Sequence, residues 1–197
     1  MLLTRSFITY MARQLARNLA GEWVEPRDHK VLRDSLEGKI VDELSIEDEI
    51  NAEVRELLNQ YADYMRRQRI PYQEMFWKVK RKVLAERKAV SAASREPGER
   101  TMKLSRDKIV ELSHKLAGAL PRVPGTRLLK PWNEVRLEIV SQLTDILIQE
   151  ETIDKIAQEK ISSQKRDIPE GSEEWSLLYR RYYEEEMKRY GIDLSMV

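Results

Sequence analysis

The stretch Met1-Leu2-Leu3-Thr4-Arg5-Ser6-Phe7-Ile8 returns, at a constant offset of 101 positions, as Met102-Lys103-Leu104-Ser105-Arg106-Asp107-Lys108-Ile109. Over the first 19 aligned positions, seven residues are identical. Further pairs follow with small shifts in offset, such as Ile70-Pro71 and Ile168-Pro169. A repeat of about a hundred residues has the size of a small domain and exceeds the unit length of solenoid proteins. The sequence therefore predicts two tandem structural repeats.

Each repeat opens with the signals of a helix start. Thr4 and Ser105 are predicted N-caps, and a leucine before each of them has the spacing of a hydrophobic staple to Ile8 or Ile109. Apolar residues then recur every three or four positions, as on the buried face of an amphipathic helix. The same reasoning predicts three more helices in each half and no strand. In the first half these are 31–44, capped by Asp28, 45–70, capped by Ser45, and 71–95. In the second half they are 134–148, capped by Asn133, a helix around 153–161, and 173–190, capped by Ser172.

These elements predict an all-α protein made of two tandem four-helix repeats. Residues 85–94 carry no apolar stripe, which is typical of a helix that bridges two domains through solvent. Pro97-Gly98 then interrupts the chain. We therefore expect an elongated, two-lobed molecule joined by a long helix, with domains at 1–95 and 102–197 and a linker at 96–101. The alternative is a single compact eight-helix bundle.

Composition excludes several classes of function. The chain has 35 Lys and Arg against 34 Asp and Glu, so its net charge is only +1 and any attraction to nucleic acid or membranes has to be local. The absence of cysteine excludes disulfides, thiolate metal sites and cysteine nucleophiles, and it fits a cytoplasmic protein. No apolar run approaches the eighteen or so residues that a membrane span requires.

Two stretches of the second half, 102–109 and 168–187, carry a resemblance to a known family. The second reads Ile168-Pro169-Glu170-Gly171-Ser172-Glu173-Glu174-Trp175 and continues to Met187. Together they resemble a bacterial family known only as domain of unknown function 507, over roughly residues 102–191. The first half looks like a diverged copy, with 70–77 where the Pro-Glu-Gly-Ser segment belongs. The resemblance implies an all-helical fold and no assigned activity.

Motifs for catalysis or metal binding are weak. Glu111 and His114 have the Glu-x-x-His spacing of a di-iron bundle, but the second histidine, His29, has Pro26 at the partner position. No Gly-x-Ser-x-Gly elbow or glycine-rich phosphate loop is present in the sequence. We therefore expect no metal, no cofactor and no catalytic residues. An enzyme would need a constellation that the sequence does not reveal.

The most basic segment is 64–88, where nine Lys and Arg against two Glu give +7 over 25 residues. Trp77 and Leu84 fall among these cations on a helical wheel. The predicted buried stripe opposite them is Phe76, Val79, Val83 and Val90. A cationic face with an aromatic ring can hold phosphates and stack a base. The candidate contact residues are Arg66, Arg67, Arg69, Trp77, Lys78, Lys80, Arg81, Lys82 and Lys88.

An acidic segment offers another explanation for the same charge. Residues 42–56 contain seven acids against Arg55, a net charge of −6 over 15 residues. This helix would lie beside the basic one, or meet it in another subunit, and neutralise it. The sequence leaves open whether the basic face is exposed or paired.

The densest aromatic region follows Ser172. The rings recur at i, i+4, i+7 and i+8 and cover one broad helical face: Trp175, Tyr179, Tyr182 and Tyr183. Such a face either packs in a core or forms a protein interface, because these rings bury area at low entropic cost. The leading hypothesis is therefore a non-catalytic interaction protein that self-associates or holds a protein partner. Nucleic-acid binding through the basic face is the alternative, and an enzyme comes third.

Overall fold

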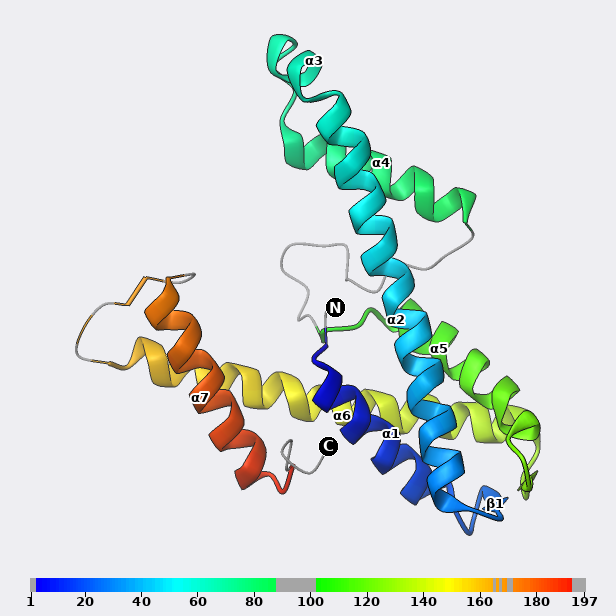
Figure 1. The fold of residues 1–197 in the computed structure, drawn as a ribbon. Helices are drawn as coiled ribbons and strands as arrows, with labels where there is room; N and C mark the ends of the chain where they lie inside the picture. The colour runs from blue at the N-terminus through cyan, green and yellow to red at the C-terminus, as the bar shows by residue number, and fades with distance from the viewer. Residues whose placement is uncertain (1–2, 88–101, 165, 167, 170–171, 193–197) are drawn as a thin grey trace.

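The computed structural model describes residues 3–87, 102–164, 166, 168–169 and 172–192, and this part of the chain is mostly helical (Figure 1). The first half contains α1 (Arg5–Leu19), β1 (Val24–Pro26), α2 (His29–Gln60), α3 (Ala62–Arg67) and α4 (Tyr72–Glu86). The second half contains α5 (Arg106–Ala119), the short 3-10 helix η1 (Leu120–Arg122), β2 (Thr126–Leu128), α6 (Trp132–Ser162) and α7 (Glu173–Arg189). The predicted all-α class is confirmed.

Side-chain caps set most of the helix starts where the sequence predicts them. The hydroxyl of Thr4 accepts a hydrogen bond from the amide three residues on at 3.3 Å, and the hydroxyl of Ser105 does the same at 3.1 Å. Asp28 and Ser172 cap α2 and α7 in the same way. Asn133 does not cap α6, because that helix already begins one residue earlier, directly after a proline. Each cap satisfies an amide that would otherwise lack a partner.

Two predicted helix breaks are wrong. The helix α2 continues through Ser45, whose hydroxyl donates to the carbonyl of Asp42 at 2.9 Å, and α6 continues through Ile148. Neither segment contains glycine or proline at the predicted break, and buried apolar residues continue on both sides of it. A serine can bond to a carbonyl of the preceding turn, so its presence alone does not end a helix.

A small sheet, which the sequence did not predict, joins the two halves. The strands β1 and β2 are antiparallel, with Val24 opposite Leu128 and Pro26 opposite Thr126. Beside them, the Arg27 amide donates to the Gly125 carbonyl at 2.8 Å. Gly125 has φ of 70°, and a Cβ atom there would lie 2.7 Å from the Arg27 Cβ, so this position requires glycine. Three-residue strands are too short to show a periodic pattern in sequence.

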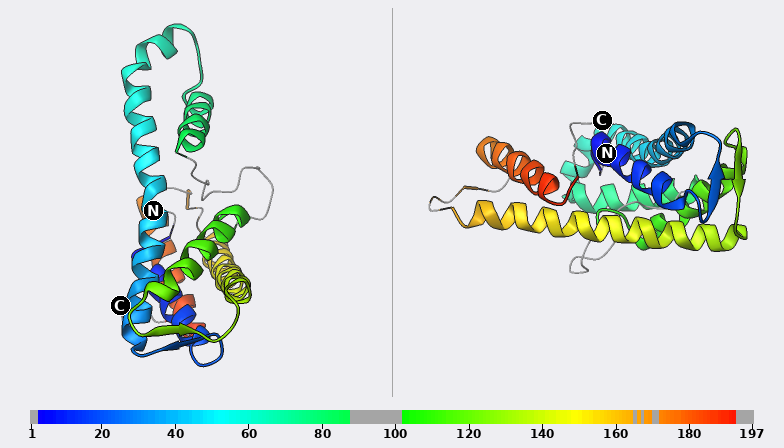
Figure 2. Two further views of the ribbon diagram at one scale, coloured as in Figure 1. Left: turned by 90° about the vertical axis from the view of Figure 1, so that its right-hand side faces the viewer. Right: turned by 90° about the horizontal axis from the view of Figure 1, so that it is seen from below.

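The main hydrophobic core draws on both halves of the chain. The first helix of each half, α1 or α5, packs against the two long helices α2 and α6 (Figure 2). One cluster of buried side chains includes Leu15 and Leu36 from the first half and Leu116 and Leu143 from the second. We call the body the part of the molecule outside residues 50–87, which contains α1, the first part of α2, α5, α6 and α7. The predicted boundary at 96–101 therefore does not coincide with a division of the core.

A second, smaller core lies in what we call the arm, residues 50–87, which projects from the body in Figure 1. It comprises the distal part of α2 with α3 and α4, and α2 and α4 pack along each other. Its buried side chains are Ile50, Val54, Leu58, Met65, Val83 and Leu84. The core thus divides inside α2. The helix predicted over 71–95 is described only as far as Glu86, and residues 88–101, with Lys88, Val90 and most of the predicted bridging segment, lie outside the described residues.

The projecting arm predicts an extended molecule in solution. Small-angle scattering should give a radius of gyration several ångströms above the roughly 16 Å expected for a compact globule of this length. The reason is that α2 alone spans about 48 Å at 1.5 Å per residue. A value near 16 Å would mean that the arm folds back on the body.

Because α2 continues through Ser45, we can predict whether replacing this serine raises or lowers the free energy of unfolding. Ser45→Ala should leave the free energy of unfolding unchanged or raise it by up to about 0.5 kcal/mol, since alanine is the better residue inside a helix. Urea denaturation measures this change. The control is Asp28→Ala, which removes a true cap and should lower the free energy of unfolding by about 1 kcal/mol. A similar loss from Ser45→Ala would show that a separate helix begins at Ser45.

Candidate nucleic-acid interface

The arm exposes most of the cations that the sequence singles out. Arg66 and Arg67 lie at the end of α3 and Arg69 in the turn after it, where its φ of 55° lies in the left-handed region. On α4, Lys78, Arg81 and Lys82 are exposed. The structure therefore brings these six cations to the surface of a single projecting element.

Lys80 departs from the prediction. Its side chain is 3 % exposed, and its ammonium lies 5.2 Å from the centroid of the Trp77 ring. Leu84, also expected on the cationic side, is only 5 % exposed. Both differences have one cause, because α2 packs along α4 and covers a wider sector of it than the predicted stripe. Lys80 is thus part of the arm's packing rather than of its exposed face.

The acidic helix does not pair with all of the basic face. Arg87 forms an ion pair with Glu53 of α2, and Lys78 forms one with Glu74 of its own helix at 2.6 Å. Arg66 lies 3.7 Å from Asp63. Among the described residues, no ion pair is made by Arg67, Arg69, Arg81 or Lys82. Side-by-side packing of α2 and α4 therefore leaves part of the basic charge open to solvent.

Aromatic rings accompany these cations. Trp77 and Tyr72 are 50 % and 45 % exposed, and Phe76 lies between them, stacked on the Tyr72 ring at 6.3 Å and edge-on to Trp77 at 5.9 Å. Two further tyrosines, Tyr61 and Tyr64, are more than half exposed at the start of α3. These exposed aromatic rings offer flat faces on which another planar group can stack.

A cavity of about 330 Å³ opens on this part of the arm. It is lined by Arg55 of α2 and by Tyr72, Gln73, Phe76 and Trp77 of α4. Sequence reasoning did not single out Arg55, because it is the one cation within the acidic segment 42–56 and was counted only against those acids. Its position one residue after the buried Val54 was the available signal that it lies at the edge of the packed face.

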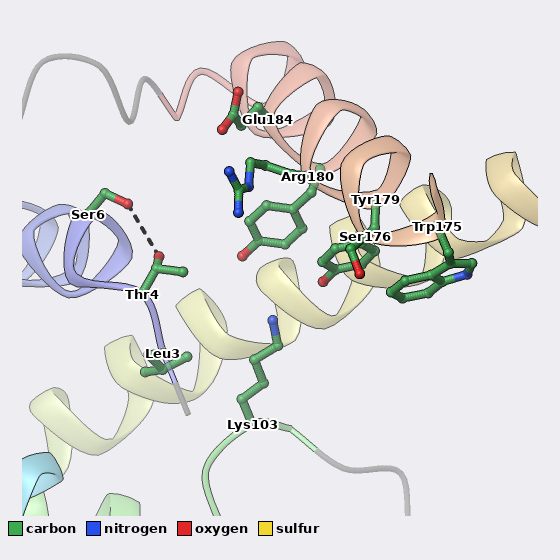
Figure 3. A pocket seen from close by; sticks show the side chains of 10 residues that line it. Leu3, Thr4, Ser6, Lys103, Trp175, Ser176, Tyr179, Arg180 and Glu184 are labelled. Atoms are coloured by element: carbon green, nitrogen blue, oxygen red, sulfur yellow. Dashed lines mark hydrogen bonds between the residues drawn. The ribbon is translucent and has the colours of Figure 1, made fainter. Parts of the chain in front are cut away.

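The aromatic residues of α7 lie against the body. The rings of Trp175 and Tyr179 stack with their centroids 5.0 Å apart (Figure 3). The Tyr179 ring stacks in turn on Tyr183 at 5.6 Å. Tyr183 is buried and belongs to the main core, and the others are half-buried. Tyr182, also half-buried, lies under the ammonium of Lys160. The structure thus places these four residues in intramolecular packing.

Buried acids of α6 engage this aromatic stack. The Tyr183 hydroxyl donates to Glu150 at 2.7 Å, and the Tyr179 hydroxyl donates to Asp154. Lys103 forms ion pairs with both carboxylates. Burial raises the pKa of both phenols, and the adjacent carboxylates raise it further, so both hydroxyls remain donors at neutral pH.

A cavity of about 400 Å³ lies between α7 and the start of α1 (Figure 3). Leu3, Thr4 and Ser6 form one side, and the stacked rings of α7 form the other. One of its two cations, the half-buried Lys103, is already held by Glu150 and Asp154, and the other, Arg180, shares the lining with the acid Glu184. This cavity therefore lacks the surplus of positive charge that the arm carries.

In the described structure, Glu111 and His114 do not lie beside further side chains that could bind a metal ion with them. Glu111 accepts hydrogen bonds from Lys108 and Lys115, while His114 is exposed and contacts the Trp132 ring. Burial raises the pKa of Glu111, but the hydrogen bonds from the two lysines outweigh it and hold that pKa below its ordinary value. Within the described ranges, no group of three or more His, Cys, Asp or Glu residues is arranged to hold a metal ion.

A family model described as Protein of unknown function (DUF507) matches residues 1–192. The chain belongs to this family. The match covers both halves, so the resemblance is wider than the 102–191 that the sequence motifs suggested. That the first half of this DUF507 protein is a diverged copy of the second stays a prediction. No curated protein matches the chain. None of the described helices is long and apolar enough to cross a membrane.

The α7 network predicts a loss of stability when one hydroxyl is removed. Tyr183→Phe should lower the free energy of unfolding by about 1.5–3 kcal/mol, because it deletes a hydrogen bond to the fully buried Glu150 carboxylate. Urea denaturation provides the measurement. Tyr182→Phe is the matched control, since its hydroxyl bonds to the exposed Gln164 and its loss should cost less than about 1 kcal/mol. Equal effects would show that the Glu150 bond does not stabilise the fold.

Proposed function

We propose that this DUF507 protein is a non-catalytic interaction protein that binds nucleic acid through its arm. The observation that carries the proposal is that Arg67, Arg69, Arg81 and Lys82 are exposed and form no ion pair within the described structure, on the same arm that exposes the rings of Trp77 and Tyr72. Cations neutralise phosphates and release their counterions, and rings stack on bases. The arm exposes both kinds of group.

Local charge supports a polyanionic partner. The arm, residues 50–87, contains nine Lys and Arg against five acids, which gives +4, whereas the whole chain carries +1. The attraction is therefore confined to the arm. Residues 3–49 and 102–192, which include the body, contain 23 Lys and Arg against 26 acids, a net charge of −3, so they add no general attraction for a polyanion.

A protein partner is the second candidate, because Tyr, Trp and Arg are also enriched at protein interfaces. Two observations favour nucleic acid. Two of the three exposed cations of α4 are lysines, which protein interfaces disfavour. The aromatic face of α7, on which the protein-partner hypothesis first depended, is engaged within the body.

Two further expectations belong to the same proposal. The cysteine-free composition supports a cytoplasmic location, where nucleic acid is accessible. Binding requires no metal or cofactor, since cations and aromatic rings suffice for it.

The proposal predicts salt-dependent binding that depends on the arm. Fluorescence anisotropy with labelled DNA and RNA oligonucleotides of about 20 nucleotides, single-stranded and duplex, should show affinity that falls as salt rises. Changing Lys78, Arg81 and Lys82 together to Gln should weaken binding and flatten the log–log salt slope by up to about 2–3, since each phosphate contact contributes about 0.7–0.9.

The matched control removes three exposed cations of the body, Arg122, Lys130 and Lys188, and should change the slope little. Equal effects of the two triple variants would place binding outside the arm. No binding to any oligonucleotide at low salt would overturn the proposal. Loss of a native protein partner from the arm variant alone would then favour the second candidate.

A further inference from the structure

We infer that the arm cavity of Arg55, Tyr72, Gln73, Phe76 and Trp77 holds one unpaired nucleobase, so that the arm prefers single strands to duplexes. This inference rests on the proposed function and names the form of nucleic acid that the arm binds. It assigns a role to Arg55, which lies outside the basic segment of the sequence.

The rings of the cavity are held in place before any ligand arrives. Phe76 contacts both Tyr72 and Trp77, and the buried Lys80 holds its ammonium over the Trp77 ring at 5.2 Å. About half of the Trp77 side chain nevertheless remains exposed. A ring that is already fixed loses little conformational entropy when a base stacks on it.

The size of the cavity suits one small planar group. Its volume of about 330 Å³ lies at the lower end of the range for small-molecule sites, roughly 300–1,000 Å³. Stacking against an aromatic side chain is the usual way in which proteins hold bases of a single strand. A paired base would first have to leave its helical stack, which costs a few kcal/mol.

Polar groups at the cavity complement a nucleotide. Arg55 is exposed, makes no ion pair among the described residues, and presents a planar guanidinium that stacks on a base or grips a phosphate. The amide of Gln73 supplies both donors and acceptors for a base edge. Arg81 lies one helical turn beyond Trp77, about 40° away around α4, and is placed to meet the next phosphate.

The other exposed cations of α4 face away from the cavity. Lys78 and Lys82 lie about 100° and 140° from Trp77 around the helix axis. They contribute to general attraction of phosphates, whereas Arg55 lines the cavity and Arg81 lies closer to Trp77 around the helix axis. We therefore expect Arg55 and Arg81 to favour single strands over duplexes, whereas Lys78 and Lys82 should strengthen the binding of both forms alike.

A comparison within the molecule supports an external ligand for the arm. The α7 helix presents a similar arrangement, with Trp175 stacked on Tyr179, and there Leu3 and Thr4 of the same chain form the facing side of the cavity. Among the described residues, the lining of the arm cavity comes from α2 and α4. Its rings thus remain open to a partner of complementary charge.

The test uses the full chain and an oligonucleotide that carries a single 2-aminopurine in an otherwise uniform pyrimidine strand. Stacking on Trp77 should quench the 2-aminopurine fluorescence on binding. Trp77→Ala should abolish that quenching and weaken single-strand binding about 5- to 150-fold, with an unchanged salt slope. Trp77→Phe should retain part of both effects, and circular dichroism confirms that each variant is folded.

The matched control is Trp132→Ala, which removes a tryptophan of similar exposure from the body and should leave binding and quenching unchanged. Arg55→Gln should weaken single strands more than duplexes, while the Lys78 and Lys82 double variant should weaken both alike. Equal affinity for both forms without quenching, in a protein that still needs the arm cations, would overturn the inference and leave the proposed function standing. No binding to either form would overturn both.

Discussion

The arrangement of the molecule depends on α2 remaining one unbroken helix of 32 residues. Its first half is buried in the body, with Leu32, Leu36 and Ile40 fully or almost fully covered, and its second half forms one side of the arm. A helix is stiff over this length, so the position of α3 and α4 follows from how the first half of α2 packs. A break in the middle of α2 would separate the arm from the body while leaving both cores intact.

Buried charge ties the two halves together near the middle of that helix. Glu43 of α2 is 4 % exposed and pairs with Lys115 of α5, which also contacts Glu111. Burial lowers the pKa of Lys115, but the hydrogen bonds that its ammonium donates to both acids outweigh this effect and raise the pKa above its ordinary value. Burial of ions is costly unless each charge has partners, so this network constrains how α2 and α5 pack on each other.

The same principle of satisfied and unsatisfied charge distinguishes the two aromatic regions. On α7, acids of α6 accept hydrogen bonds from the tyrosine hydroxyls and pair with Lys103, so the polar groups at this stack have partners within the chain. On the arm, several cations near Trp77 lack such partners in the described structure. Rings whose neighbouring charges are paired within the chain stabilise the fold, whereas rings near unpaired cations are suited to binding a partner.

The amino-acid sequence determined the features that depend on neighbours along the chain. It predicted the helical class, the caps at Thr4, Ser105 and Ser172, and the basic character of the arm, because these follow from local hydrogen bonding and from composition. It missed the small sheet, since strands of three residues carry no period.

Only the tertiary structure decided how these elements meet. Ser45 carries a capping signal, yet packing on both sides of it continues α2. Lys80 is basic, yet it is buried and holds its ammonium over the Trp77 ring. Arg55 belongs to an acidic segment, yet it lines the cavity beside the same ring. The reason is physical: a local signal is worth about 1 kcal/mol, and burial of a continuous apolar face outweighs it. Which charges remain exposed depends on the helix that packs beside them, and that neighbour is not encoded at any single position.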